Sequence, residues 1–159
     1  RLFDPNMGIR TKIVAALADL MRRKEDGTYA AEGVRSQVIS AISYFDDRGL
    51  FAMLEVGINQ AERMADVEKL VKYSPQAGKF LKKVAADRTE TLEMRKAAVQ
   101  LLGQIGYVNA LSELERLRNR IETRLAGQKS MPFAPSGSGD EVALLPDLQK
   151  SILALKAST

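Results

Sequence analysis

Apolar residues recur along most of this chain with the three- and four-residue spacing of an amphipathic helix. The first stripe, led by Ile9 and Ile13, predicts a helix over residues 7–23, and Asp4-Pro5-Asn6 in front of it is typical of a turn. Later stripes predict helices over residues 34–45, 50–61, 67–73, 76–86, 92–105, 111–125 and 144–155. Val34 belongs to the first of these stripes and Leu153 to the last, and Gly106 closes the helix over residues 92–105. No segment alternates with a period of two for long enough to predict a strand, so the pattern predicts an all-α fold.

Breaks in the pattern separate these helices. Polar, glycine-containing stretches at residues 24–28 and 46–49 end the first two helices, and Ser74-Pro75 ends the fourth, because proline disfavours helix in the residue before it. Residues 130–140 are rich in Pro, Gly and Ser and predict a flexible linker. A phosphate-cradling loop would need a strand in front of it, and none is predicted. The helix after this linker either folds back as a cap or reaches for a partner.

The chain contains an internal repeat. Residues 33–42 align with residues 93–102 without a gap, and the match continues through the following turn. It pairs Arg35 with Arg95, Val38 with Ala98, Ile42 with Leu102, Phe45 with Ile105, Asp46 with Gly106, and Leu54 with Leu114. The predicted hairpin at residues 67–86 has the length of one further, degenerate unit. Self-similarity at a fixed period is the signature of a solenoid, in which stacked hairpins share a core.

The second copy of the repeat carries a family resemblance. Its residues Arg95-Lys96-Ala97-Ala98, then residues 101–106 (LLGQIG) and Ala110-Leu111, closely resemble a HEAT-like repeat of the short bacterial, phycobilisome-lyase type. The resemblance implies that the arginine braces neighbouring hairpins and that a small residue before the turn lets paired helices approach. The copy at Arg35 departs from the pattern, with Ser43 and Asp46 in place of glycines, and the middle unit has no matching arginine. The resemblance extends from residue 33 to residue 124.

Repeat and resemblance together predict an α-solenoid of about three HEAT-like helical hairpins with flanking capping helices. We expect an N-terminal capping helix and loop at residues 1–32, the repeat array at 33–126, a Pro/Gly/Ser-rich flexible loop at 127–143 and a C-terminal helix at 144–159. A chain of 159 residues is long enough to bury a core of its own.

Composition narrows the function. The chain has no His and no Cys, so it lacks an imidazole base, a thiolate nucleophile and the usual ligands of zinc. A carboxylate, Lys or Tyr mechanism would need a spacing that the sequence does not contain. We therefore expect a non-enzymatic protein without metal or cofactor. A chromophore-lyase activity follows only from the family's name.

The net charge and the first residues of the chain bear on its partners and its compartment. The net charge is +4, which permits an anionic partner without the clustered excess of a dedicated nucleic-acid binder. No apolar run reaches the length of a membrane span. Because the chain opens Arg1-Leu2-Phe3-Asp4, without Met or an apolar leader, we expect a fragment or processed product that has lost any targeting signal. The compartment stays unknown, with the cytoplasm as the default.

Three arginines are the first candidates for a binding surface. Arg116, Arg120 and Arg124 recur at every fourth position opposite an apolar stripe, so they should project together into solvent, partly offset by Glu113. This arrangement is that of an ordinary solvated face. Alternatively, it is a surface for an anionic partner, because arginine grips carboxylate or phosphate with two donors.

Lysines and one aromatic residue complete the candidate surface. Lys79, Lys82 and Lys83 cluster on one predicted helix and serve either solubility or nucleic-acid contact, although no aromatic residues interleave with them for stacking on bases. Phe133 lies in the Pro-rich loop, where it either docks back on the stack or anchors a partner.

Other notable side chains are better explained by structure. Arg10, Arg35 and Arg95 occupy repeated positions and should brace the fold. Asp46 should cap a helix or lie in a turn, and the tyrosines and Phe3 should pack in the core or at its edge. We therefore expect a scaffold for protein–protein interaction, as part of a larger protein or assembly. The alternative is a nucleic-acid-binding module that uses its basic helix faces, and a steep salt dependence of binding would identify it.

Overall fold

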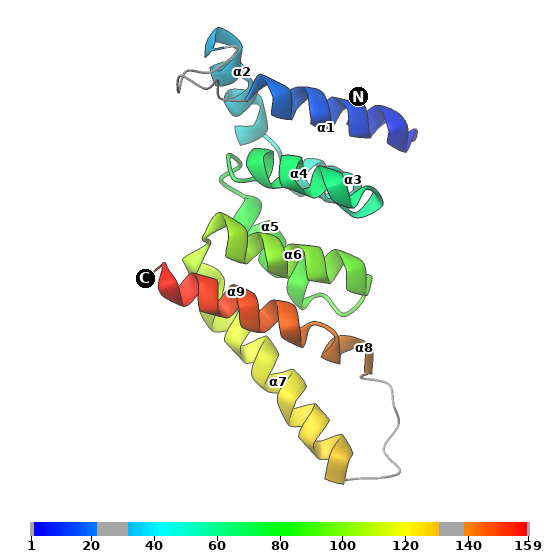
Figure 1. Cartoon of the computed structure of the whole chain (residues 1–159), viewed down its shortest axis with the longest axis vertical. Coiled ribbons are helices and arrows are strands. Elements are labelled where there is room, and N and C mark those ends of the chain that lie inside the picture. The colour runs from blue at the N-terminus through cyan, green and yellow to red at the C-terminus, as the bar shows by residue number, and fades with distance from the viewer. Residues whose placement is uncertain (1, 22–31, 131–138, 159) are drawn as a thin grey trace. The chain divides into compact units, whose positions relative to one another are not determined.

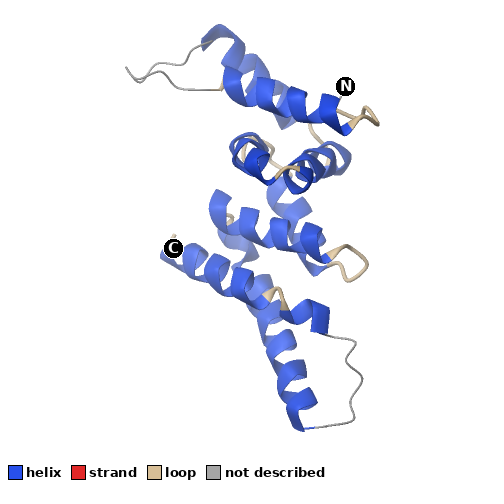
Figure 2. Ribbon diagram, turned by 45° about the vertical axis from the view of Figure 1, so that its right-hand side comes forward, coloured by secondary structure: helices blue, strands red, loops and turns tan. Residues whose placement is uncertain are grey.

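The computed structural model describes residues 2–21, 32–130 and 139–158, and all regular secondary structure in these ranges is helical (Figures 1 and 2). The α-helices are α1 (Met7–Leu20), α2 (Glu32–Ser43), α3 (Asp47–Asn59), α4 (Met64–Val71), α5 (Ala77–Ala86), α6 (Leu92–Ile105), α7 (Leu111–Ser130), α8 (Gly139–Val142) and α9 (Leu145–Ala157). Short 3-10 turns, η1 (Ala61–Arg63) and η2 (Val108–Ala110), precede α4 and α7. The predicted all-α class is confirmed.

Side chains at the helix ends explain where several helices begin and stop. Asn6 and Asp46 accept hydrogen bonds from the backbone N–H groups of Gly8 and Gly49, at 2.9 and 3.2 Å, and so cap α1 and α3. Thr91 caps α6 in the same way. These contacts confirm the predicted turn at Asn6 and the predicted cap at Asp46.

The described residues group into two compact units, residues 1–80 and residues 81–159. The division falls inside α5 and inside the predicted repeat array, so each unit holds one copy of the sequence repeat. Each unit has its own buried apolar residues.

In the first unit, α4 packs against α1 and α3. The buried core includes Val14 of α1, Met53 of α3 and Leu70 of α4. Gly57 lets α3 and α4 approach closely, because a Cβ atom there would lie 2.8 Å from the side chain of Met64. The short α4 is therefore held between two longer helices.

In the second unit, α9 lies along α6 and also contacts α7 (Figure 1). The buried face of α9 consists of Leu148, Ile152 and Leu155, together with Ser151. The Ser151 hydroxyl donates a 2.7 Å hydrogen bond to the carbonyl of Val99 on α6. Of the two alternatives for the C-terminal helix, folding back is what the structure shows.

Four apolar positions of the repeat are buried in both units, whereas other equivalent positions, such as Gln37 and Ala97, differ in burial. The following pairs are buried in both copies: Val38 and Ala98, Ile42 and Leu102, Leu50 and Ala110, Leu54 and Leu114. The closest helix neighbours differ from the predicted hairpin partners, however. Helix α3 lies closer to α4 than to α2, and α6 lies closer to α9 than to α7.

Three sequence expectations about packing are wrong. Leu153, which we assigned to the apolar stripe of α9, is 68% exposed, because it lies one residue beyond Ile152 and so about 100° around the helix. Tyr44, expected to pack, follows the end of α2 and is 86% exposed. Val34 is also exposed. Phe3 is partly exposed and lies under the guanidinium of Arg48, 4.3 Å from its ring centre.

Helices occupy both ends of the predicted loop at residues 127–143. Helix α7 continues to Ser130, and α8 begins at Gly139. Phe133 and the basic run Arg22-Arg23-Lys24 lie outside the described residues.

Candidate functional site

The arginines of α7 form the starting point of the candidate site. Leu114, Leu117 and Ile121 bury one face of α7, and the arginines lie on its other faces. The prediction that all three arginines project freely into solvent is wrong for Arg120 and Arg124, because both bind the carboxylate of Glu141. The next helix along the chain, α8, thus takes up part of the predicted surface.

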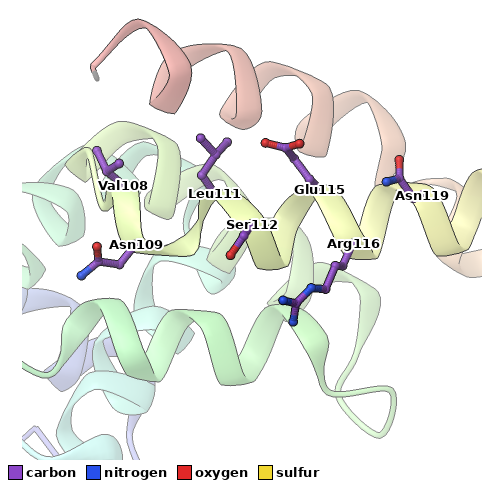
Figure 3. A pocket seen from close by; sticks show the side chains of 7 residues that line it. All are labelled: Val108, Asn109, Leu111, Ser112, Glu115, Arg116 and Asn119. Carbon is purple, nitrogen blue, oxygen red and sulfur yellow. The ribbon is translucent and has the colours of Figure 1, made fainter.

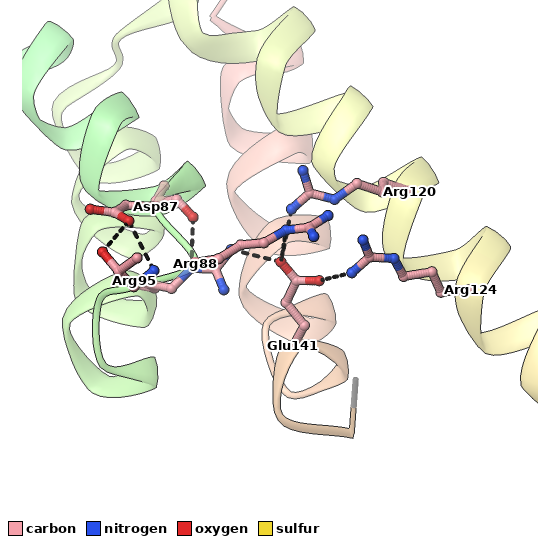
Figure 4. Close-up of polar contacts among 8 residues, drawn as sticks. Asp87, Arg88, Arg95, Arg120, Arg124 and Glu141 are labelled. Atoms are coloured by element: carbon pink, nitrogen blue, oxygen red, sulfur yellow. Dashed lines mark hydrogen bonds and ion pairs between the residues drawn. The ribbon is translucent and has the colours of Figure 1, made fainter. Parts of the chain in front are cut away.

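Four arginines surround Glu141, and we call Arg88, Arg95, Arg120 and Arg124 the arginine cluster (Figure 4). Oε1 of Glu141 accepts hydrogen bonds from Nη2 of Arg120 at 2.8 Å and from Nη2 of Arg95 at 3.0 Å. Oε2 accepts one from Nη1 of Arg124 at 3.0 Å. Nε of Arg88 lies 3.9 Å from Oε1.

The cluster is assembled from separate elements of the second unit. Arg95 comes from α6, and its Nε also donates a 3.0 Å hydrogen bond to the carbonyl of Ala85 at the end of α5. Arg95 is itself buried, so it braces α5, α6 and α8, as its repeated position predicts. In the first unit, Arg10 has a similar structural role, bonding to the carbonyl of Asp4 and to Glu55.

Arg88 lies in the turn between α5 and α6, and Asp87 shapes this turn. The carboxylate of Asp87 accepts hydrogen bonds from both the hydroxyl and the backbone N–H of Thr89, at 2.6 and 2.9 Å. These hydrogen bonds, with a smaller contribution from the charge of Arg95, lower the pKa of Asp87. The turn is thus fixed by an ionised carboxylate.

Glu141 remains a carboxylate despite its burial. Only 8% of its side chain is exposed, and burial by itself raises the pKa of a carboxyl group. Hydrogen bonds from Arg95 and Arg120, and their charges, act in the opposite direction and together prevail, so the pKa of Glu141 is lowered. The cluster is therefore a true ion-pair network at neutral pH.

Arg116 differs from its two neighbours because it is exposed and lies at a shallow depression of about 550 Å³. The depression is lined by Val108, Asn109, Leu111, Ser112, Glu115, Arg116 and Asn119 (Figure 3). Arg116 and Ser112 extend on one side of α7, and Glu115 extends on the side where α9 lies (Figure 3). The guanidinium is exposed and can meet an external anion.

The three lysines of α5 do not form a uniform basic surface. Nζ of Lys82 lies 2.9 Å from Oε1 of Glu113, and this hydrogen bond raises the pKa of Lys82. Glu113 therefore pairs with Lys82, not with the arginines as we expected. Lys79 and Lys83 are exposed, and Lys83 has an interaction of its own.

Sequence reasoning missed Glu141 and Arg88 as members of the cluster. Neither residue stands in a recognisable motif, and Glu141 follows a Pro/Gly/Ser-rich segment whose path no local pattern determines. The signal present in the sequence was the spacing of Arg120 and Arg124, because two arginines one helical turn apart favour an anion close to both of them.

The described residues contain no group of three or more acidic side chains placed to hold a metal ion. Within the same ranges, none of the helices has both the length and the apolar composition needed to cross a membrane. Comparisons with protein-family models, with characterised proteins and with solved structures found no match to this chain. The HEAT-like resemblance of residues 33–124 therefore stays a prediction from sequence.

Proposed function

We propose that this chain is a non-enzymatic, HEAT-like repeat scaffold that binds a protein partner through an acidic segment of that partner. The repeat supports the scaffold part, because four equivalent apolar positions are buried in both copies. Repeat proteins of this kind use extended surfaces for binding. The lack of His and Cys supports the non-enzymatic part.

The observation that carries the binding role is the row of guanidinium groups along α7. Arg116 is exposed, and Arg120 and Arg124 keep 37% and 39% of their side chains exposed while they bind Glu141. Successive positions in this row are one helical turn apart, so an extended acidic segment meets them in order. Arginine is a favoured residue for contacts with carboxylates at interfaces.

The proposal is tested by fluorescence anisotropy with a labelled oligoglutamate peptide. Arg116→Glu should weaken binding about fivefold or more, because one attraction becomes a repulsion at a side chain that does not bind Glu141. Lys12→Glu is the matched control, since Lys12 is exposed on α1 and its reversal changes the net charge equally. Equal losses in the two variants would mean that only net charge matters, and would contradict a site on α7.

A duplex DNA probe tests the nucleic-acid alternative. Phosphate-driven binding falls steeply between about 50 and about 200 mM salt. The ion pair between Lys82 and Glu113 places a carboxylate against the lysines of α5, which disfavours a continuous phosphate-binding surface there. Salt-sensitive binding of the duplex without binding of oligoglutamate would replace the proposed function by its alternative.

A further inference from the structure

The arginine cluster has more hydrogen-bond donors than Glu141 uses. Each guanidinium carries five N–H donors, and a carboxylate has only two oxygens. Nε of Arg120 is buried and has no hydrogen-bond acceptor among the described residues. Nε of Arg88 lies 3.9 Å from the carboxylate, beyond hydrogen-bond distance. The cluster is therefore incompletely satisfied by its internal anion.

The positive charges of the cluster also outnumber the negative charge that they bind. Four guanidinium groups face the single negative charge of Glu141, with Asp87 as the next carboxylate beside Arg95. A phosphoryl group carries a charge of about −1.5 to −2 at neutral pH and three acceptor oxygens. It matches the cluster better than one carboxylate does, both in charge and in number of acceptors.

The cluster is open on one side. Arg88 is 51% exposed, and Arg120 and Arg124 are each more than a third exposed, whereas Arg95 and Glu141 are buried behind them. In Figure 4 the two arginines of α7 approach Glu141 from one side and Arg88 and Arg95 from the other. An anion from solvent therefore meets three arginines before it reaches the buried one.

We infer that the arginine cluster is a phosphoryl-binding site in which Glu141 is the resident anion, and that a phosphorylated side chain of the partner protein displaces it. The inference rests on the proposed function, because it specifies which acidic group the partner presents. Glu141 then acts as an internal competitor that occupies the cluster until the partner is phosphorylated.

The probe for this inference is a short glycine-flanked phosphoserine peptide, titrated into the full chain by calorimetry. The same peptide with serine, and with glutamate, at the central position gives the reference affinities. The wild-type protein should bind the phosphoserine peptide most tightly of the three. Inorganic phosphate that binds as tightly as the phosphopeptide would overturn the assignment to a partner protein.

Glu141→Gln removes the competing charge and preserves the size of the side chain, so it should tighten phosphopeptide binding about tenfold or more. Asp147→Asn is the matched control: it makes the same charge change in the same segment, at a carboxylate that bonds only to Gln100 in the described structure. This control should alter the affinity less than about twofold. A gain in Asp147→Asn equal to that in Glu141→Gln would overturn the site, and so would no gain in Glu141→Gln.

Arg124→Gln keeps the test decisive if Glu141→Gln does not fold. Arg124 is partly exposed and contributes one of the three hydrogen bonds to Glu141. Its loss should weaken phosphopeptide binding about tenfold, and unchanged binding would overturn the inference. Failure here is distinct from failure of the proposed function, because Arg116 lies outside the cluster. If oligoglutamate binding still depends on Arg116, the scaffold function stands without a phosphoryl site.

Discussion

At the scale of single residues, Glu141 connects the stability of the second unit with its candidate function. A buried carboxylate is costly unless hydrogen bonds and opposite charges compensate it. Glu141 receives that compensation from Arg95, Arg120 and Arg124, which belong to two different helices. The same ion pairs that attach α8 to α6 and α7 also occupy the arginine cluster.

Replacement of Glu141 should reveal its contribution through the pH dependence of stability. We expect Glu141→Gln to lower the free energy of unfolding by about 1–3 kcal/mol at pH 7, because charged hydrogen bonds are replaced by neutral ones. The pKa of Glu141 is lowered in the folded state from its ordinary value of 4.5, so the carboxylate stabilises the fold fully above that pH. The contribution is lost as pH falls through the folded-state pKa.

Urea unfolding of both proteins between pH 7 and pH 3 measures this effect. The difference between wild type and Glu141→Gln should shrink as the solution becomes more acidic than about pH 4.5. Asp147→Asn serves as the control, with a smaller difference at pH 7. A difference that grows towards low pH would contradict the ion-pair account of Glu141.

Gly103 is a second residue whose role depends on its surroundings. A Cβ atom at Gly103 would lie 2.6 Å from Oγ and 2.9 Å from Cα of Ser151, so α9 would have to move. We expect Gly103→Ala to destabilise the protein by about 1–3 kcal/mol, although alanine is the better helix former. Gly127→Ala in α7, where a Cβ atom has open space, should be neutral or stabilising by up to about 1 kcal/mol. Urea unfolding distinguishes the two, and similar effects would disprove close packing at Gly103.

At the scale of elements, α9 is the helix whose position the sequence left open. It is attached to α6 by the close approach at Gly103 and by the hydrogen bond from Gln100 to Asp147, and it buries three large apolar side chains. In α9, Leu153 is exposed and Leu155 is buried, so the effects of their replacement on stability can be compared within one helix.

Leu155→Ala should destabilise the protein by about 2–5 kcal/mol, because it removes a fully buried side chain and leaves a cavity. Leu153→Ala removes the same atoms from an exposed position and should change stability by less than about 0.5 kcal/mol. Thermal unfolding followed by circular dichroism measures both. Equal losses would show that α9 packs through a different face.

At the scale of the whole molecule, the chain divides into two compact units that each contain one copy of the repeat. Ile42 in the first unit and Leu102 in the second are equivalent in the repeat, and both are fully buried. Because cooperative unfolding units coincide with regions of dense packing, each unit should respond to the loss of its own core residue.

Hydrogen–deuterium exchange tests this division. Ile42→Ala should speed amide exchange mainly within residues 32–71, and Leu102→Ala mainly within residues 92–157, each through a loss of about 2–5 kcal/mol. The exchange pattern of each variant is compared with that of the wild type, segment by segment. Faster exchange throughout the chain in either variant would indicate one cooperative unit.

The sequence by itself determined the helices, because their signals are local. Apolar spacing located every described helix except the short α8 to within about five residues, and Asp46 and Gly106 marked helix ends through cap and turn chemistry that needs no distant partner. The gap-free repeat also aligned four apolar positions that are buried in both copies. Periodicity placed Leu153 on the buried face of α9, although it is exposed, because apolar spacing alone does not tell which of two adjacent apolar residues, Ile152 or Leu153, faces the core.

Only the tertiary structure decided which helices are neighbours and which charges meet. The close pairs, α3 with α4 and α6 with α9, depend on what lies opposite Gly57 and Gly103, and spacing along one helix does not encode this. Likewise, the spacing of Arg120 and Arg124 predicted a solvated row, whereas the fold places the carboxylate of Glu141 against both of them. Ion pairs between residues on different helices are set by the packing of those helices, so the arginines could be singled out from the sequence, whereas the carboxylate that they bind could not.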